Sequence, residues 1–143
     1  MKEKHVQEMR SFSRFYTDVL GLLNTHILAS RFSLPEVRIM YELYHKNHST
    51  AKGICDGLHI DKGQLSRILV KLESEKLVTR TRSKDDQRAV QLSLTGKGIS
   101  EFEILNKASN QQVKQLLIQI DEKNLGQLLL HMNAIQRILS TVK

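Results

Sequence analysis

Hydrophobic positions recur at helical spacing in the first part of the chain. Between Met9 and Leu28, apolar residues follow one another in steps of three and four, the spacing of an amphipathic helix. Pro35 suits the first residue of a second helix, because its fixed φ matches the helix and its missing N–H needs no partner there. The apolar face of this second helix fades at residues 46–48. The pattern therefore predicts two amphipathic helices with a break before Pro35.

Two shorter helices are expected next. Ser49 or Thr50 provides the N-cap of a helix that reaches Leu58, and Asp61 provides the N-cap of the following one. The spacing in this fourth helix predicts a buried stripe of Leu65, Ile68, Leu69 and Leu72. The opposite stripe is polar and consists of Gln64, Arg67, Lys71 and Ser74. One face is therefore expected in the core, and the other is available to a partner.

The period changes to that of β-strands in the middle of the chain. Residues 78–82 and 90–94 alternate between apolar and polar, and the polar segment between them has the composition of a turn. This arrangement predicts a β-hairpin. Thr95 then caps a long helix that runs to about Ile120, and Asp121 begins another.

The last predicted helix carries the most regular apolar pattern in the chain. Two sets of residues repeat every seven positions: Leu125, Met132 and Leu139, and Leu128, Ile135 and Val142. Such a heptad seam fits the side of another helix. One alternative is packing onto the first helix of the same chain. The other, which the apolar faces at both ends of the chain favour, is a dimer interface formed by Leu125, Leu128, Met132, Ile135 and Leu139.

From residue 34 to residue 94, the order of elements is that of a winged helix-turn-helix. We expect a mainly α (α+β) fold with a single domain over residues 1–143, because this length is typical of one domain. Residues 34–94 would form the winged lobe. Residues 5–30 and 99–143 would form N- and C-terminal dimerisation helices.

Positive charge is concentrated in the winged lobe. The chain has 22 Lys and Arg against 15 Asp and Glu, a formal charge of +7. Residues 62–88 hold eight basic and four acidic residues, so more than half of the excess falls in less than a fifth of the chain. A helix with one polar face fits the major groove of B-DNA, and the hairpin tip then lies beside that groove. Double-stranded DNA is therefore the expected partner, contacted by Thr50, Lys62, Gln64, Ser66, Arg67, Lys71, Lys84 and Arg88.

A family resemblance rests chiefly on the hairpin. Residues 86–98, which read D-Q-R-A-V-Q-L-S-L-T-G-K-G, resemble the wing motif of MarR regulators, D-x-R-x-x-x-L-x-L-T-x-x-G. Residues 65–67 and 77–80 resemble the recognition helix and exit strand of that family, and the resemblance covers essentially the whole chain. It implies a homodimer in which Arg88 enters the minor groove and Asp86 supports the wing.

The resemblance also implies an effector pocket between the dimerisation helices and the DNA-binding lobe. Many MarR members are repressors released by small phenolic or lipophilic molecules, so we expect a ligand-responsive repressor acting on a pseudo-palindromic site. Two residues depart from the family pattern. Pro35 stands in place of a common threonine cap, and Lys76 replaces the glycine usual after the recognition helix. A left-handed conformation at Lys76 would cost on the order of 1 kcal/mol.

Two alternative functions follow from the same residues. The N-terminal half is also similar to a MarR subgroup fused to a GNAT acetyltransferase, at residues 14–17, 32–34 and 61–67. The chain shows no acetyl-CoA loop, so it would be the regulatory half of such an enzyme. A non-specific nucleic-acid-binding protein is the other alternative. Gln64 and Ser66 weigh modestly against it, because they suit base edges as well as phosphates.

Other chemistry finds little support in the sequence. Cys55 is the only cysteine, and it stands where relatives of this kind usually have a small alanine, so we interpret it as a packing residue rather than a redox sensor. The six histidines lack metal-ligand spacing, and no nucleophile–base pair stands out, so no metal, cofactor or catalysis is expected. No stretch approaches the roughly 18 apolar residues of a membrane span, and no signal peptide is evident. We expect a cytoplasmic protein without a membrane partner.

Overall fold

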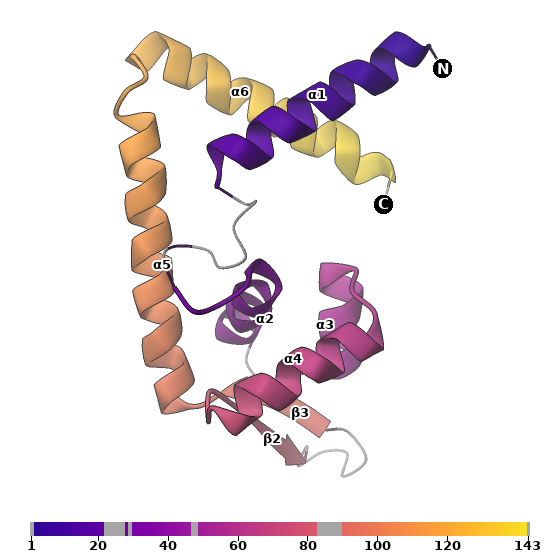
Figure 1. Cartoon of the computed structure of the whole chain (residues 1–143), viewed down its shortest axis with the longest axis vertical. Coiled ribbons are helices and arrows are strands. Elements are labelled where there is room, and N and C mark those ends of the chain that lie inside the picture. Colours follow the sequence, from indigo (N-terminus) through magenta and orange to yellow (C-terminus); the bar gives the residue numbers. More distant parts are fainter. Residues whose placement is uncertain (1, 22–27, 29, 47–48, 83–89, 143) are drawn as a thin grey trace. The chain divides into compact units, whose positions relative to one another are not determined.

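A computed structural model describes residues 2–21, 28, 30–46, 49–82 and 90–142 (Figure 1). The chain divides into two compact units. The first unit spans Met1–Asn106 and the second Lys107–Lys143. The first unit contains α1 (Glu3–Val19), α2 (Leu34–His45), β1 (Ser49–Thr50), α3 (Ala51–Leu58), α4 (Lys62–Ser74), β2 (Val78–Arg82), β3 (Val90–Leu94) and the start of α5 (Gly96–Leu117). The second contains the end of α5, α6 (Glu122–Leu139) and a short 3₁₀ helix (Ser140–Val142). The mainly α prediction is confirmed.

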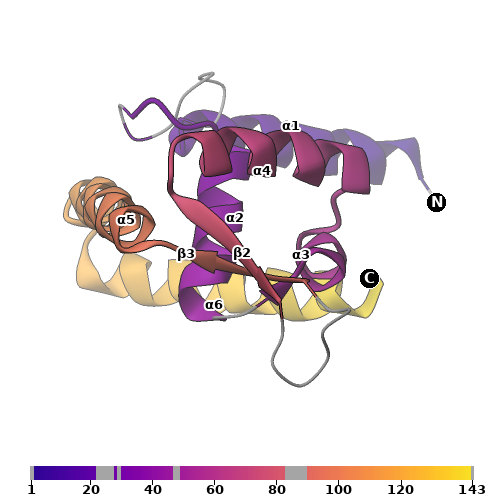
Figure 2. The same ribbon diagram turned by 90° about the horizontal axis from the view of Figure 1, so that it is seen from below.

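The winged lobe contains an antiparallel sheet with strand order β1-β3-β2. Strands β2 and β3 pair from Val78 opposite Leu94 to Arg82 opposite Val90, which confirms the predicted hairpin strands at residues 78–82 and 90–94. Strand β1 was not predicted, and it pairs with the middle of β3. Figure 2 shows the hairpin lying across α2, with α4 to one side.

One hydrophobic core joins the helices of the lobe to its sheet. The predicted stripe of α4 supplies Leu65, Leu69 and Leu72 to this core, with Ile68 half-buried at its edge. The other buried hydrophobic residues are Phe32, Ile39, Met40, Leu43, Ile54, Leu77, Val78, Leu92, Leu94, Phe102 and Leu105. The core thus fixes which face of α4 points outward.

Side-chain caps start the helices where the sequence predicts them. Thr50 Oγ1 accepts a hydrogen bond from Gly53 N at 3.1 Å at the start of α3. Asp61 Oδ1 accepts one from Gln64 N at 2.9 Å at the start of α4, and Asp121 does the same for α6. Each cap satisfies an N–H that has no partner within its helix.

The bounds of α1 and α2 differ from the sequence prediction. Helix α1 ends at Val19, well before Leu28, because Gly21 has a positive φ of 64° and its N–H returns to Asp18 O at 2.9 Å. Helix α2 begins at Leu34, one residue before Pro35, with Ser33 as its N-cap. Glu36 Oε2 accepts the Ser33 N–H at 2.7 Å, so a capping box starts this helix.

A left-handed residue ends α4. Lys76 has a φ of 61°, as expected for the position where the MarR pattern has glycine. Its N–H donates to Glu73 O, and the N–H of Leu77 donates to Leu72 O, both at 2.9 Å. These are the two hydrogen bonds of a Schellman motif, and Leu72 and Leu77 are both buried in the core.

The residue before α5 is hydrogen-bonded to the residues that follow α4. Thr95 N donates to Leu77 O at 2.9 Å, and Thr95 Oγ1 donates to Lys76 O at 2.6 Å. The same Oγ1 accepts from Gly98 N at 3.0 Å, so the predicted Thr95 cap is confirmed. A Cβ at Gly98 would lie 2.0 Å from Leu77 O, and only glycine allows this approach. The L-T-x-x-G part of the wing motif therefore builds this junction.

Helices α1 and α6 contain no buried residue, and both are described over their whole length. In α6, Leu125 and Met132 are half-buried, whereas Leu128, Ile135 and Leu139 are exposed. Val142 lies in the 3₁₀ helix, so the α-helical part of the heptad pattern ends at Leu139. The exposed apolar residues of α1 are Val6, Met9, Phe12, Phe15, Tyr16 and Val19. Each helix thus presents an apolar face that its own unit leaves uncovered.

Candidate nucleic-acid interface

The outward face of α4 lies opposite its core stripe. Because successive residues turn by about 100°, Gly63, Arg67, Val70 and Ser74 lie opposite Leu65, Leu69 and Leu72. We call these four residues the outer stripe; all of them are exposed. Of the predicted contacts, only Arg67 lies at its centre. Ser66 and Lys71 flank it, Lys62 is exposed at the start of the helix, and Gln64 is half-buried at the side.

Lys71 has a partner inside the protein. Its Nζ donates to Glu36 Oε1 at 2.7 Å, and the Glu36 side chain is only 8% exposed whereas that of Lys71 is 44% exposed. The other Glu36 oxygen accepts the Ser33 N–H of the capping box. One buried carboxylate therefore links the start of α2 to α4, and the ammonium of Lys71 is oriented toward it.

The electrostatics of Glu36 follow from this pairing. Burial by itself would raise the pKa of the carboxyl, but the hydrogen bonds from Lys71 and Ser33 and the charge of Lys71 outweigh it. The pKa of Glu36 is therefore lower than its ordinary value, and the carboxylate is ionised at neutral pH. Its charge favours the lysine orientation seen here.

The acidic residues near the end of α4 are also paired. Glu73 accepts hydrogen bonds from Arg80 on β2, one of them from Nη2 at 3.2 Å. Glu75 pairs with Arg31, and the Arg31 guanidinium lies 4.4 Å from the centre of the Phe32 ring. These contacts neutralise carboxylates that would otherwise repel a phosphate backbone from this end of the helix.

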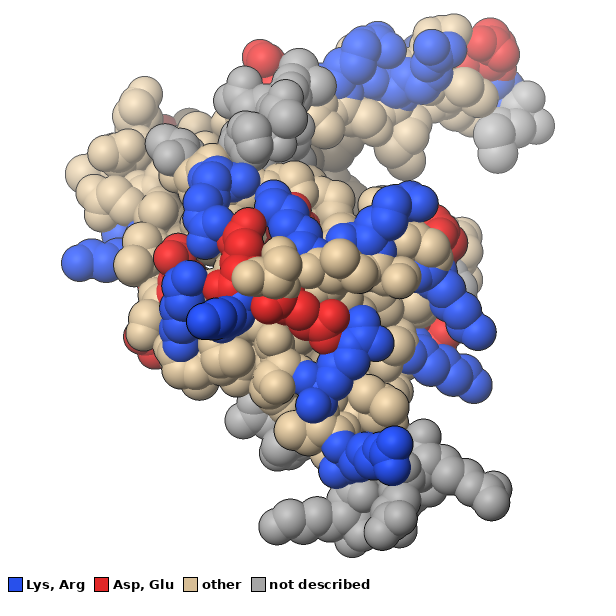
Figure 3. Space-filling model, turned by 60° about the horizontal axis from the view of Figure 1, so that its bottom comes forward, with Lys and Arg blue, Asp and Glu red and all other residues tan. Residues whose placement is uncertain are grey.

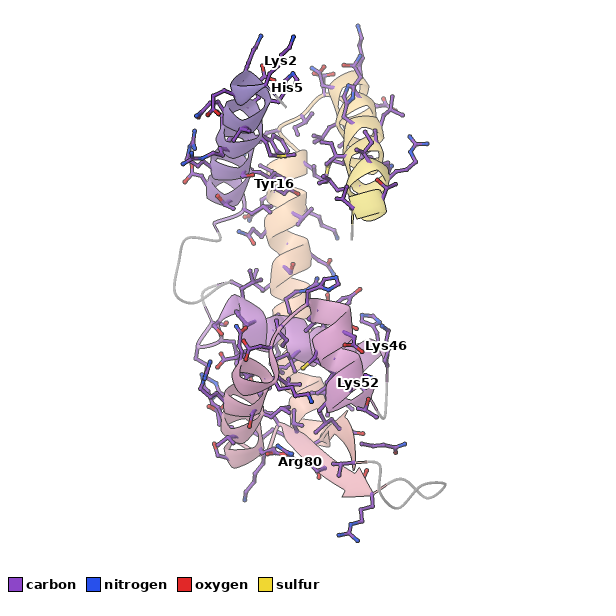
Figure 4. The ribbon with its side chains drawn as sticks, turned by 90° about the vertical axis from the view of Figure 1, so that its right-hand side faces the viewer. Lys2, His5, Tyr16, Lys46, Lys52 and Arg80 are labelled. Atoms are coloured by element: carbon purple, nitrogen blue, oxygen red, sulfur yellow. The ribbon has the colours of Figure 1, made fainter. Side chains whose placement is uncertain are left out.

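Several basic side chains remain outward. Within the described part of the chain, Lys52, Lys62, Arg67 and Arg82 form no ion pair within 4.0 Å. Figure 3, which brings the lower side of Figure 1 forward, shows Lys and Arg side chains spread over this face with acidic side chains among them. Figure 4 shows Lys46 and Lys52 near the end of α2 and the start of α3, with Arg80 on β2. This distribution suits a partner with a negatively charged backbone.

The remaining predicted contacts fall into two groups. Thr50 is exposed, and its hydroxyl oxygen caps α3. Lys84, Asp86 and Arg88 lie outside the described residues. Their predicted roles therefore stay predictions from the wing motif.

Three exposed residues were missed at the sequence level. Gly63 and Val70 belong to the outer stripe, and Lys52 lies in the first turn of α3. A helical wheel centred on Leu65, Leu69 and Leu72 identifies the first two. They were missed because the outward face was assigned by polarity rather than by angle.

The fold and the polar face of α4 define a winged-helix DNA-binding protein. The chain belongs to the SarA/Rot family of transcriptional regulators, whose family model matches residues 27–105. It is 39% identical over 126 residues to the HTH-type transcriptional regulator SarZ of Staphylococcus haemolyticus, covering 87% of this chain and 86% of that protein. It is 29% identical over 99 residues to the HTH-type transcriptional regulator MhqR of Bacillus subtilis, covering 69% and 68%.

A solved structure supports the fold. The structure of FabT from Streptococcus pneumoniae in complex with DNA superposes with a TM-score of 0.82, covering 97% of this chain and 99% of that chain at 19% identity. The structure of a MarR family protein from Bacillus stearothermophilus has the same fold, with a TM-score of 0.81 at 16% identity. The MarR-type winged helix expected from the wing motif is therefore confirmed, and the chain is a DNA-binding transcriptional regulator.

Other kinds of functional site have little support among the described residues. Among the described residues, no three His, Cys, Asp or Glu side chains are grouped so as to hold a metal ion. No helix in the described ranges is long and apolar enough to cross a membrane. Cys55 is half-buried against the core, in agreement with its interpretation as a packing residue. The relatives named above are regulators rather than enzymes.

Proposed function

We propose that the protein is a ligand-responsive repressor that binds a pseudo-palindromic DNA site as a homodimer, in the cytoplasm. The observation that carries the DNA-binding mode is the division of α4 between its core stripe and its outer stripe. A helix of this kind enters the major groove with its outer residues against base edges. With two subunits, the half-sites would be about one helical turn apart, roughly 34 Å.

Different elements of the winged lobe contact the DNA bases and the DNA phosphate backbone. Arg67 at the centre of the outer stripe and Ser66 and Gln64 beside it suit base edges. Phosphate contacts are supplied by Thr50, Lys52, Lys62 and Lys71, of which Lys71 also keeps its bond to Glu36. In the wing, Lys84 contacts the backbone, Arg88 enters the minor groove and Asp86 supports the hairpin, as the motif implies.

Dimer formation is supported by the uncovered apolar faces of the terminal helices. A seam along α6 contains no fully buried residue, and three of its five members are exposed; it consists of Leu125, Leu128, Met132, Ile135 and Leu139. Helix α1 presents a second such face. Burial of both against a second copy removes apolar surface from water. An effector bound near these helices would then change the spacing of the two lobes.

Selection of binding sites from a random duplex DNA pool at near-physiological salt tests this function. We expect an inverted repeat whose half-sites are about one turn apart. Arg67→Ala should weaken binding to the selected site by about tenfold or more, because a bidentate base contact contributes about 1–3 kcal/mol. Arg137→Ala, on the side of α6 away from the seam, is the matched control and should leave affinity unchanged. Enrichment of no site, or an equal decrease in both variants, would contradict the proposal.

A further inference from the structure

One exposed residue of the recognition helix is apolar. Val70 is 61% exposed, and it lies in the outer stripe between Arg67 and Ser74. Within α3 and α4, which are both fully described, it is the one large hydrophobic side chain on the surface. Its neighbours on this face are small, polar or charged. A single exposed valine is ordinary on a protein surface, so exposure alone does not indicate a function for Val70. Its position on the helix has to supply the argument.

The position of Val70 separates it from the other apolar surfaces. The exposed apolar residues of α1 and α6 form continuous faces suited to helix packing, whereas Val70 stands alone on a polar face. Since it lies opposite Leu65, Leu69 and Leu72, it contributes nothing to the core of the lobe. A helix docked in the major groove would present Val70 to base edges together with Arg67.

The chemistry of the groove supplies one apolar partner for such a side chain. The C5 methyl group of thymine is the apolar group displayed at base edges in the major groove. We propose that Val70 is a specificity-determining residue that contacts the methyl group of one thymine in each half-site. This inference rests on the proposed function and adds a base preference to it. Val70 follows Arg67 by three residues, about 4.5 Å along the helix, so its thymine lies one or two base pairs from the base that Arg67 reads.

Replacing thymine by deoxyuridine tests the contact, because it removes only the methyl group. In the selected site, each thymine is replaced in turn, symmetrically in both half-sites, and affinity is measured at constant salt. We expect one symmetric position at which wild-type affinity falls by about fourfold for each methyl group removed. Val70→Ala should bind the thymine and deoxyuridine duplexes within about twofold of each other. Alanine has a higher helix propensity than valine, so this variant should fold.

Ile104→Ala is the matched control. Ile104 is similarly exposed, at 66%, but it lies on α5 outside the recognition helix, so this variant should keep the wild-type response to deoxyuridine. Three outcomes overturn the inference. In the first, wild type is insensitive to deoxyuridine at every position; in the second, Val70→Ala retains the full response. In these two cases the proposed function still holds, provided that the selection yields an inverted repeat. In the third, no site is enriched at all, so the proposed function fails and the base preference fails with it.

Discussion

Replacement of Gly98 by alanine should destabilise the winged lobe through a collision with backbone. The added Cβ would lie 2.0 Å from Leu77 O, 3.0 Å from Leu77 C and 3.2 Å from Leu94 Cδ2. Ordinary van der Waals contacts begin near 3.4 Å, so α5 or the carbonyl has to move by about 1 Å or more. The carbonyl of Leu77 is held in place by the N–H of Thr95. A change of side-chain rotamer therefore cannot relieve the collision.

The magnitude follows from the two interactions that must change. Overpacking at a well-filled position costs about 1–3 kcal/mol. Displacement of Leu77 O also weakens its 2.9 Å hydrogen bond with Thr95 N, which contributes about 1 kcal/mol. We therefore expect Gly98→Ala to lower the free energy of unfolding by about 2–4 kcal/mol. For a chain of this length, this lowers Tm by about 6–12 °C.

Gly96→Ala provides a matched control two residues away in the same helix. Nothing lies within 4 Å of a Cβ at Gly96, so the variant should be unchanged or up to about 1 kcal/mol more stable. Urea and thermal denaturation of the two variants, followed by circular dichroism, measure the difference. If Gly98→Ala unfolds at the same denaturant concentration as Gly96→Ala, the close approach of α5 to Leu77 is not a constraint and the reasoning is wrong.

Four further predictions address other parts of the molecule. Lys76→Gly should raise the free energy of unfolding by about 1 kcal/mol, since the left-handed φ of 61° costs glycine little; a lower Tm would contradict this. Glu36→Gln should cost about 1–2 kcal/mol at pH 7 because it removes the buried charge. The pKa of Glu36 is lowered on folding, so its contribution to stability is complete above its ordinary value of 4.5 and is lost as the pH falls through the lower folded value. The difference in unfolding free energy between wild type and Glu36→Gln, measured by urea denaturation, should therefore shrink as the pH falls below 4.5, and a constant difference would refute the pairing. Ile135→Glu should convert a dimer to monomers in sedimentation velocity, whereas Arg137→Glu, off the seam, should not. Arg88→Ala should weaken binding to a selected site while Tm and sedimentation stay as in wild type; unchanged affinity would contradict its role in the wing.

Features determined by neighbouring residues could be predicted from the sequence. The caps at Thr50, Asp61 and Thr95 each need a hydroxyl or carboxylate within three residues of a free N–H, and the sequence displays that spacing. The hairpin strands also follow from their alternation over short distances. Strand β1 could not be predicted, because two residues carry no period and their pairing is with β3, far along the chain.

The candidate site was predicted in part. The sequence predicted α4 and the side of it that faces the core, since the apolar spacing of this helix is regular. It did not show that Lys71 binds Glu36, because the partners are 35 positions apart and neither residue has an unusual local pattern. Val70 was missed because an apolar residue on a helix is ordinarily assigned to the core. The end of α1 was misplaced because apolar spacing continues beyond Gly21, where the backbone turns.

The junction between α4 and α5 has a consequence for how such a regulator acquires new targets. Its hydrogen bonds join the backbone of residues 72–77 to Thr95 and to the side chain of Lys97. The close approach at Gly98 also requires that this residue has no side chain. The outer stripe contributes no side chain to this junction or to the core. In the proposed binding mode, substitutions at Arg67 or Val70 alter the preferred DNA sequence while the core and this junction are retained. Residues proposed to read DNA are therefore different from residues that hold the fold. After duplication of the gene, one copy can change its target genes while its fold is retained.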